Sequence, residues 1–179
     1  PAGFDCEGLK QIHWEGMGTF EQGWVFGNLL GDGHFKSDQE TGVLQFWGDT
    51  KDEMLALALQ RIETLGGDSR YHQQRTGTSV EDRDMVSAKT RQAWLMAPEF
   101  GIAHNKDITN DTVLTASSDF QQGFLRGLFD ADGSVQGDQQ KGVSVRLGLA
   151  NRQHLAVIQK MLMNFGINST IYNDRREAG

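Results

Sequence analysis

Apolar residues along the chain follow two spacings, one typical of helices and one typical of strands. Helices are predicted at residues 20–30, 51–65, 91–100 and 152–165. Shorter apolar runs predict strands at residues 43–47 and 143–149. The turn-prone segment Thr76-Gly77-Thr78 predicts a polar hairpin, with strands at residues 69–74 and 83–89.

The same order of elements occurs twice, 100 residues apart. Residues 20–33 read FEQGWVFGNLLGDG and residues 120–133 read FQQGFLRGLFDADG, and glycine identities continue in this register to Gly66 and Gly166. Two copies are too few for a solenoid and suit a pseudo-symmetric pair within one chain. Only thirteen residues follow Gly166, so the second copy is predicted to lack the hairpin and closing helix of the first.

This duplication predicts how the chain is divided. Residues 1–19 are expected to be an extension or linker, residues 20–119 a first half, and residues 120–179 a second half that is incomplete at its C-terminal end. The length of 179 residues suits one compact domain built from two small fused halves.

Glycines recur inside the first predicted helix of each copy, at Gly23, Gly27, Gly123 and Gly127. A glycine within a helix costs about 1 kcal/mol relative to alanine, so close packing against another backbone is expected to offset the loss. The simplest partner of each glycine face is the glycine face of the other copy. Such packing would leave Asp32 and Asp132, at the ends of the two helices, close together.

Two neighbouring carboxylates at helix C-termini repel each other and meet the negative end of the helix dipole. A divalent cation reverses both penalties, and carboxylate oxygens, carbonyl oxygens and water suit Mg²⁺. We therefore predict a metal site at Asp32 and Asp132, with the carbonyl groups of Gly31 and Ala131 as further ligands. Asp-Gly after an apolar run is often only a turn, but the joint recurrence of glycines and acid favours the metal site.

Charge and cysteine content restrict the function. The formal net charge of −7 disfavours nucleic acid as a partner, because phosphate contacts favour Lys and Arg, although an uneven distribution still allows a local basic surface. Cys6 is the only cysteine, which excludes an internal disulfide and a cysteine-rich zinc site and is typical of a reducing, cytoplasmic protein. No apolar run reaches the roughly 20 residues that span a bilayer, so no membrane contact is expected.

Three segments resemble motifs of the LAGLIDADG homing endonuclease family, in its intein-borne form. Residues 125–133, LRGLFDADG, are close to the motif that names the family, and residues 26–33, FGNLLGDG, resemble its first copy. Residues 106–109, KDIT, resemble a block that precedes the second motif, with Thr109 in place of the usual proline. Pro1 cannot be the nucleophile of protein splicing, so the resemblance implies the endonuclease part of a larger intein.

The resemblance implies an α+β fold in which two αββαββα halves form a saddle of antiparallel sheets, here with a shortened second half. It implies a monomeric, site-specific endonuclease that hydrolyses phosphodiester bonds of double-stranded DNA with Mg²⁺ or Mn²⁺. Asp32 and Asp132, the last acids of the motifs, would bind the metal, and Lys106 would stabilise charge near the scissile phosphates. Asp130 has no acidic counterpart at Leu30, so we expect it to have a local capping or packing role.

Contacts to DNA are expected from polar residues in or near the predicted strands. These residues are Gln45, Arg70, His72, Gln74, Arg75, Lys141, Arg146 and Arg175. Arg and Gln can make bidentate hydrogen bonds to guanine and adenine. A polar strand face is also often only solvated, and two alternatives to the nuclease stay open: a non-cleaving DNA- or RNA-binding module, such as a regulator or maturase, and an inactivated endonuclease.

Overall fold

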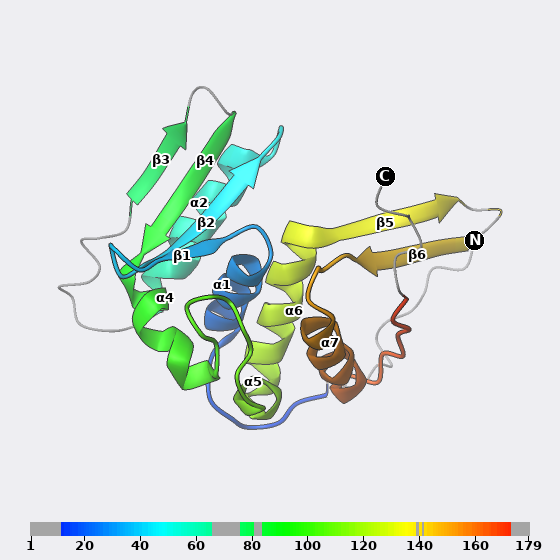
Figure 1. Ribbon diagram of the computed structural model, residues 1–179. Coiled ribbons are helices and arrows are strands. Elements are labelled where there is room, and N and C mark those ends of the chain that lie inside the picture. Colours follow the sequence, from blue (N-terminus) through cyan, green and yellow to red (C-terminus); the bar gives the residue numbers. More distant parts are fainter. Residues whose placement is uncertain (1–11, 66–75, 81–83, 139, 141, 173–179) are drawn as a thin grey trace.

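The computed structural model describes residues 12–65, 76–80, 84–138, 140 and 142–172 (Figure 1). Its elements, in chain order, are α1 (Phe20–Leu30), β1 (His34–Lys36), β2 (Thr41–Trp47), α2 (Lys51–Glu63), β3 (Thr76–Val80), β4 (Met85–Thr90), α4 (Arg91–Met96), the 3₁₀ helix η3 (Ala97–Phe100), α5 (Thr112–Thr115), α6 (Ser118–Asp132), β5 (Gly133–Asp138), β6 (Gly142–Leu147) and α7 (Arg152–Asn164). All paired strands are antiparallel, in a four-stranded sheet of order β1-β2-β4-β3 and a two-stranded sheet of β5 and β6. The fold is therefore α+β and duplicated, with a shorter second half within the described residues, as the sequence predicts.

The two central helices organise the molecule. α1 and α6 lie side by side in the middle, and the two sheets extend from them on opposite sides (Figure 1). In the first half, α2 packs against β2 and β4, and Leu44 and Phe46 of β2 are buried in one apolar cluster with Ile62 of α2. The sheet of the first half thus has a helix-covered apolar face.

Four glycines set the contact between α1 and α6. At each of these positions an added Cβ would lie only 1.9–2.1 Å from a backbone carbonyl oxygen of the facing helix; the positions are Gly23, Gly27, Gly123 and Gly127. Any side chain there would collide with backbone. The two helices therefore approach as closely as backbones can, which brings their C-terminal ends together.

Side-chain caps define where the central helices begin. Thr19 caps α1 through a capping box with Gln22. At the start of α6, the Ser117 hydroxyl accepts a hydrogen bond from the Phe120 amide at 3.0 Å and donates one to the Gly18 carbonyl at 2.5 Å. Both caps use a short polar side chain to satisfy amides that have no partner within the helix.

Replacing Ser117 by alanine is expected to destabilise the protein by about 1 kcal/mol, because both of these hydrogen bonds are lost. In a domain of this size that corresponds to a fall in Tm of about 2–4 °C. Thr50→Ala is the matched control, since Thr50 precedes α2 without making a side-chain cap. Thermal denaturation followed by circular dichroism measures both, and equal falls in Tm would contradict the capping role.

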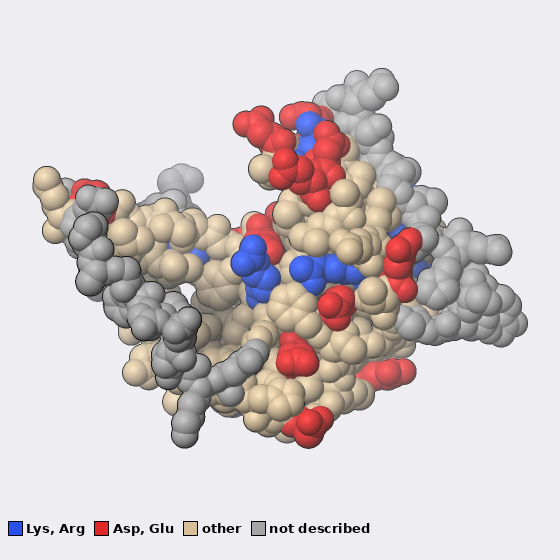
Figure 2. All heavy atoms as spheres, turned by 180° about the vertical axis from the view of Figure 1, so that it is seen from behind, with Lys and Arg blue, Asp and Glu red and all other residues tan. Residues whose placement is uncertain are grey.

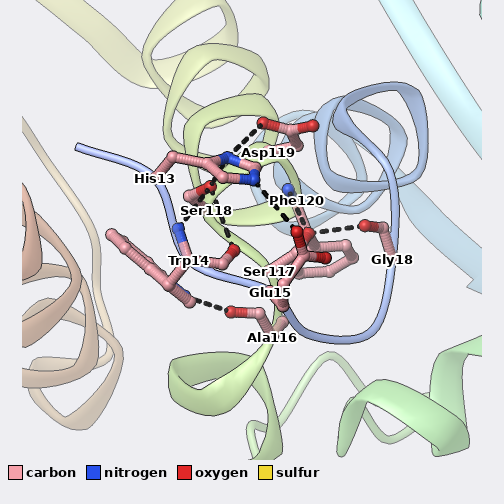
Figure 3. Close-up of polar contacts among 9 residues, drawn as sticks. All are labelled: His13, Trp14, Glu15, Gly18, Ala116, Ser117, Ser118, Asp119 and Phe120. Carbon is pink, nitrogen blue, oxygen red and sulfur yellow. Dashed lines mark hydrogen bonds and ion pairs between the residues drawn. The ribbon is translucent and has the colours of Figure 1, made fainter. Parts of the chain in front are cut away.

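Residues before α1 pack on the second half (Figure 3). The Trp14 ring contacts the Phe165 ring, with centroids 5.0 Å apart, and its indole N–H donates to the Ala116 carbonyl at 2.8 Å. His13 lies 2.9 Å from the Ser118 hydroxyl, which also bonds to the Trp14 backbone. Although Ser118 and His13 lie near Asp119, Ser118 is fully buried, so this group holds the chain in place and cannot act as a nucleophile toward a substrate.

The first-half hairpin differs from the one the sequence predicts. The predicted turn at Thr76-Gly77-Thr78 lies inside β3, and the predicted strand at residues 69–74 lies outside the described residues. β3 is the edge strand of its sheet, where a glycine is tolerated, and β-branched threonines favour extended backbone. A turn prediction from Thr-Gly-Thr alone was therefore wrong.

Candidate metal centre and nucleic-acid interface

The two aspartates predicted to bind metal lie at the ends of the central helices. Asp132 is the last residue of α6, and Asp32 follows Gly31, the C-cap residue of α1. A Cβ built on Gly31 would lie 2.6 Å from the Ala131 Cβ and 3.0 Å from an Asp132 carboxylate oxygen. The close helix contact thus delivers both carboxylates, and the backbone of Gly31 and Ala131, to one place.

Lys106 reaches this place from the segment between the two halves. Its ammonium group donates hydrogen bonds to the Gly31 carbonyl at 2.9 Å and the Gly33 carbonyl at 3.0 Å. The lysine therefore neutralises the negative end of the α1 dipole. Lys106 itself has a positive φ of 71°, so the backbone is held in a conformation that side-chain-bearing residues rarely adopt.

The ionisable groups of this centre perturb one another. Burial, and then the charge of Asp132, raise the pKa of Asp32, while Lys106 acts in the opposite direction. Burial also raises the pKa of Asp132 against the effect of Lys106. Burial lowers the pKa of Lys106 in spite of both aspartates. Although Asp32 is exposed and Asp132 half-buried, both carboxylates are less stable as anions than they would be in water, which favours a bound cation.

The donor set fits a hard divalent cation that also binds a substrate. Within the described residues, no group of three or more His, Cys, Asp or Glu side chains could hold a metal. Mg²⁺ commonly uses only one or two protein carboxylates and completes its oxygen shell with water and substrate phosphates. Asp32 and Asp132, with nearby carbonyl oxygens, match that pattern. One of these carbonyl groups, that of Gly31, also accepts a hydrogen bond from Lys106.

A cavity of about 240 Å³ lies beside Asp32. Its polar lining residues are Asn28, Asp32, Gln45, Thr50 and Asp130. Asn28 is buried and its side-chain oxygen has no hydrogen-bond partner within the described part of the chain. One water molecule needs only about 10–15 Å³ of such space, so this polar cavity is large enough for several water molecules next to the carboxylate.

Asp130 lies beside the centre but is occupied by other partners. Its carboxylate accepts a hydrogen bond from the Trp24 indole at 3.1 Å and is paired with Arg126 at 2.9 Å. The Trp24 bond joins α6 to α1, and the Arg126 pair lies within α6; both agree with the expected packing role of Asp130. They distinguish it from Asp132, whose carboxylate faces the end of α1.

One face of the first sheet is polar. Gln45 lies on the face of β2 opposite Leu44 and Phe46, and its side chain bonds to His34 and, at 3.1 Å, to the Met85 sulfur. Strand pairing places Lys89 opposite Val43 on this same face. Burial first, and the positive charges of Lys36, Lys106 and Lys89, lower the pKa of His34, so its ring is neutral at pH 7.

Sequence reasoning missed three of these residues. His34, Lys36 and Lys89 were not among the predicted DNA contacts, yet they lie on the same sheet face as Gln45. The alternation of side chains along β1 and β4 indicates that these residues share a face, since every second residue of a strand lies on the same side of the sheet. β1 has only three residues, which is too short a run for this alternation to be recognised in the sequence.

Most of the predicted DNA contacts lie outside the described residues, namely Arg70, His72, Gln74, Arg75, Lys141 and Arg175. Arg146 is on β6, where it donates to Gln136 at 2.7 Å and to Ser144 at 3.0 Å. It therefore belongs to a polar face of the second sheet. Gln45 and Arg146 thus lie on polar faces of different sheets, one in each half.

The surface charge is mixed. Seen from behind, basic side chains stand beside acidic ones, and a group of acids protrudes at the top of the view (Figure 2). On this face the basic side chains occupy only small areas, in keeping with the net charge of −7. Each helix of the described residues is too short or too polar to cross a lipid bilayer.

Several known proteins are similar to parts of this chain. Residues 119–179 match a family model described as a LAGLIDADG-like domain. The chain is 22% identical over 166 residues to the ribonucleoside-diphosphate reductase NrdEB subunit alpha of Bacillus subtilis, covering 87% of this chain and 15% of that protein. It is 23% identical over 163 residues to the glutamine–fructose-6-phosphate aminotransferase of Methanocaldococcus jannaschii, covering 86% of this chain and 13% of that protein. The chain thus spans only a small part of these curated relatives.

Solved structures of I-DmoI resemble most of the chain. The crystal structure of I-DmoI in complex with DNA and Mn matches with a TM-score of 0.58 and 14% identity, covering 87% of this chain and 84% of that chain. A structure of mesophilic variants of the homing endonuclease I-DmoI matches with a TM-score of 0.56 and 11% identity, covering 87% and 79%. Residues 119–179 therefore match a LAGLIDADG-like domain, and the chain as a whole has the fold of the homing endonuclease I-DmoI.

Proposed function

We propose that the chain is a site-specific homing endonuclease that hydrolyses phosphodiester bonds of double-stranded DNA with Mg²⁺ or Mn²⁺. The observation that carries this proposal is the pairing of Asp32 and Asp132 at the ends of two helices whose glycines allow backbone contact. A protein that only binds DNA gains nothing from two carboxylates that repel each other. The solved relatives described as complexes with DNA and Mn, or with DNA and Mg, support the same metal class.

Each residue of the centre has a distinct part in this reaction. Asp32 and Asp132 would hold the cation, which supplies a water of lowered pKa and stabilises the leaving oxygen. Lys106, held by two backbone carbonyls, directs its positive charge toward the same place and would stabilise charge on the phosphate. The polar cavity beside Asp32 would admit the attacking water, and the polar sheet faces that carry Gln45 and Arg146 would contact the bases.

We further propose that the chain is the endonuclease part of an intein and works as a monomer. The curated relatives are a reductase and an aminotransferase, which share no chemistry, and this chain matches at most 15% of either. A segment common to two unrelated enzymes is best explained as a separate module within each. Because one chain contributes both carboxylates, no second copy is needed to complete the centre.

Two features favour one alternative, a folded protein that binds DNA weakly or does not cut it. These features are the net negative charge of the chain and the second sheet, which has two strands within the described residues. A supercoiled plasmid carrying the uninterrupted host gene distinguishes the two. Incubation with Mg²⁺ is expected to linearise this plasmid, and EDTA is expected to prevent it. DNA binding in gel-shift assays without any cutting in Mg²⁺ or Mn²⁺ would exclude the nuclease and support the non-cleaving module.

Lys106→Met is expected to reduce the rate of cleavage by about a hundredfold while leaving DNA affinity nearly unchanged, because a positioned donor acts mainly on the transition state. Lys36→Met is the matched control. Lys36 lies on a sheet face rather than at the helix ends, so its loss should weaken binding and lower the cutting rate only below saturation. Single-turnover kinetics with saturating enzyme separate the two effects. Equal behaviour of both variants would refute a role of Lys106 in the chemical step.

A further inference from the structure

Lys106 lies in a tight turn whose backbone has an unusual conformation. The Lys106 amide donates a hydrogen bond to the Ala103 carbonyl, and the Ala103 amide donates one to the Asp107 carbonyl, both at 2.8 Å. Within this turn Lys106 has a φ of 71°, in the left-handed region that side-chain-bearing residues rarely adopt. Such a conformation persists only where surrounding contacts hold it. The contacts that hold the turn therefore also determine where the Lys106 ammonium group lies.

His104, two residues before Lys106, is fixed by aromatic side chains of the first half. Its ring stacks on the Trp94 ring of α4, with centroids 3.3 Å apart and planes 13° apart. Nε2 of the His104 ring donates a hydrogen bond to the Trp94 carbonyl at 2.9 Å, since a carbonyl oxygen can only accept. The Phe35 ring of β1 packs edge-on against both rings, with centroids 5.3 Å from His104 and 5.9 Å from Trp94. A ring that is both stacked and hydrogen-bonded gives the turn a rigid attachment.

The turn meets the chain that follows α1 at two points with matching spacing. The Lys106 ammonium group donates to the Gly33 carbonyl at 3.0 Å, and the His104 ring contacts Phe35, two residues further along. Residues two apart in the turn thus meet residues two apart in the segment after α1. This match sets the position of the turn relative to the helix end, where Lys106 also donates to the Gly31 carbonyl at 2.9 Å.

The contact of the turn with the second half is looser. Nε2 of His154 on α7 lies 3.9 Å from Oδ1 of Asp107, beyond hydrogen-bond distance. Burial, against the charge of Asp107, lowers the pKa of His154, so its ring is neutral at pH 7, and Nε2 accepts a hydrogen bond from the Asn151 side-chain amide at 3.1 Å. The Asp107 side chain is 56% exposed and bonds to Asn105 within the turn. His104 is therefore the firmer of these two attachments.

We propose that His104 is a positioning residue for Lys106: its ring, held by Trp94 and Phe35, keeps the turn in the conformation that brings the ammonium group to the end of α1. A lysine side chain is a flexible four-carbon stem, and its charge stabilises a transition state best when it is already in place. The turn removes part of this freedom before a substrate binds. The expected effect on cleavage rests on the proposed function, whereas the expected effect on the turn does not.

A double-mutant cycle with Lys106→Met tests the role of His104 in cleavage. His104→Ala is expected to lower the single-turnover rate of plasmid cleavage about tenfold in the parent and less than about twofold in the Lys106→Met protein, because a positioning residue acts only through the group that it positions. DNA affinity, measured by gel shift, should be unchanged. Equal losses of rate in both backgrounds would reveal a general effect on the fold and overturn the proposal. His104→Gln, which keeps a planar donor group, replaces the alanine variant in the same cycle if that variant does not fold.

Amide hydrogen exchange tests the positioning without cleavage. The Lys106 and Ala103 amides, which close the turn, should exchange at least about tenfold faster in His104→Ala than in the parent. His13→Ala is the matched control and should leave both amides unchanged, because His13 is also hydrogen-bonded, to Ser118, but lies at the start of α6, at the opposite end of the central helices. Equal exchange in the parent and His104→Ala would overturn the proposal. A parent protein that does not cut DNA would refute the proposed function, and the exchange of these two amides would then decide the role of His104 by itself.

Discussion

Gly27→Ala is expected to lower the stability of the protein by at least about 2 kcal/mol, whereas Gly148→Ala leaves it within about 0.5 kcal/mol of the parent. The added Cβ at Gly27 would lie 2.0 Å from the Phe124 carbonyl oxygen and 2.9 Å from the Leu128 amide nitrogen. Both atoms belong to backbone inside α6, so no rotamer change can make room, and α1 must move away along its length.

This cost outweighs the usual gain from alanine in a helix. Overpacking of a tightly packed core costs about 3 kcal/mol or more where backbone has to move, and alanine returns about 1 kcal/mol of helix propensity. The net loss corresponds to a fall in Tm of at least about 4 °C. Separation of the helices would also move Asp32 away from Asp132, so cleavage should fall together with stability.

Thermal and urea denaturation of the two alanine variants measure this difference. Gly148 is the appropriate control, because nothing lies within 4 Å of a Cβ built there and its backbone conformation suits any residue. If Gly27→Ala and Gly148→Ala have the same Tm, the close contact of α1 and α6 does not exist in solution, and the candidate metal centre loses its support.

The parts of the fold that follow from local sequence were predictable. The glycines and the Asp-Gly ends recur at the same spacing within two helices, and helical periodicity places them on one face and at one end. Lys106 was found only through its resemblance to a family motif. Its bonds to the Gly31 and Gly33 carbonyls depend on a backbone turn that no periodicity signals.

Strand register was not predictable in the same way. The 100-residue repeat aligns Gly42 with Gly142, but pairing in the second sheet is displaced by three residues relative to the first. Register depends on which residues find partners across the sheet and on the length of the turn.

Asp132→Asn should abolish cleavage and at the same time stabilise the metal-free protein. Removing one carboxylate from the cation site takes away about 4 kcal/mol of transition-state stabilisation, which is roughly a thousandfold in rate. The gain in stability follows from the charges. Burial raises the pKa of Asp132, and the charge of Asp132 helps to raise the pKa of Asp32, so both anions are penalised at neutral pH. A neutral amide relieves this penalty, and because water screens both partly exposed carboxylates we expect only a small rise in Tm.

The sign of the pH dependence provides a second readout of the same centre. A carboxyl group whose pKa is raised by folding binds its proton more tightly in the folded state than in the unfolded state. The metal-free protein therefore gains stability as the pH falls through that raised pKa toward the ordinary value of 3.8. Asp132→Asn should reduce this gain. Added Mg²⁺ should raise the Tm of the parent and not that of the variant, since a ligand stabilises only the state that binds it.

Asp130→Asn is the matched control, because it changes an acid of the same motif two residues away. Asp130 is paired with Arg126 and bonded to Trp24, so its loss should destabilise the protein by about 1 kcal/mol and leave Mg²⁺-dependent cleavage in place. The two variants therefore have opposite expected effects on both stability and activity. A result in which Asp132→Asn still cuts DNA in Mg²⁺ while Asp130→Asn does not would move the metal to Asp130 and reverse the assignment of the two acids.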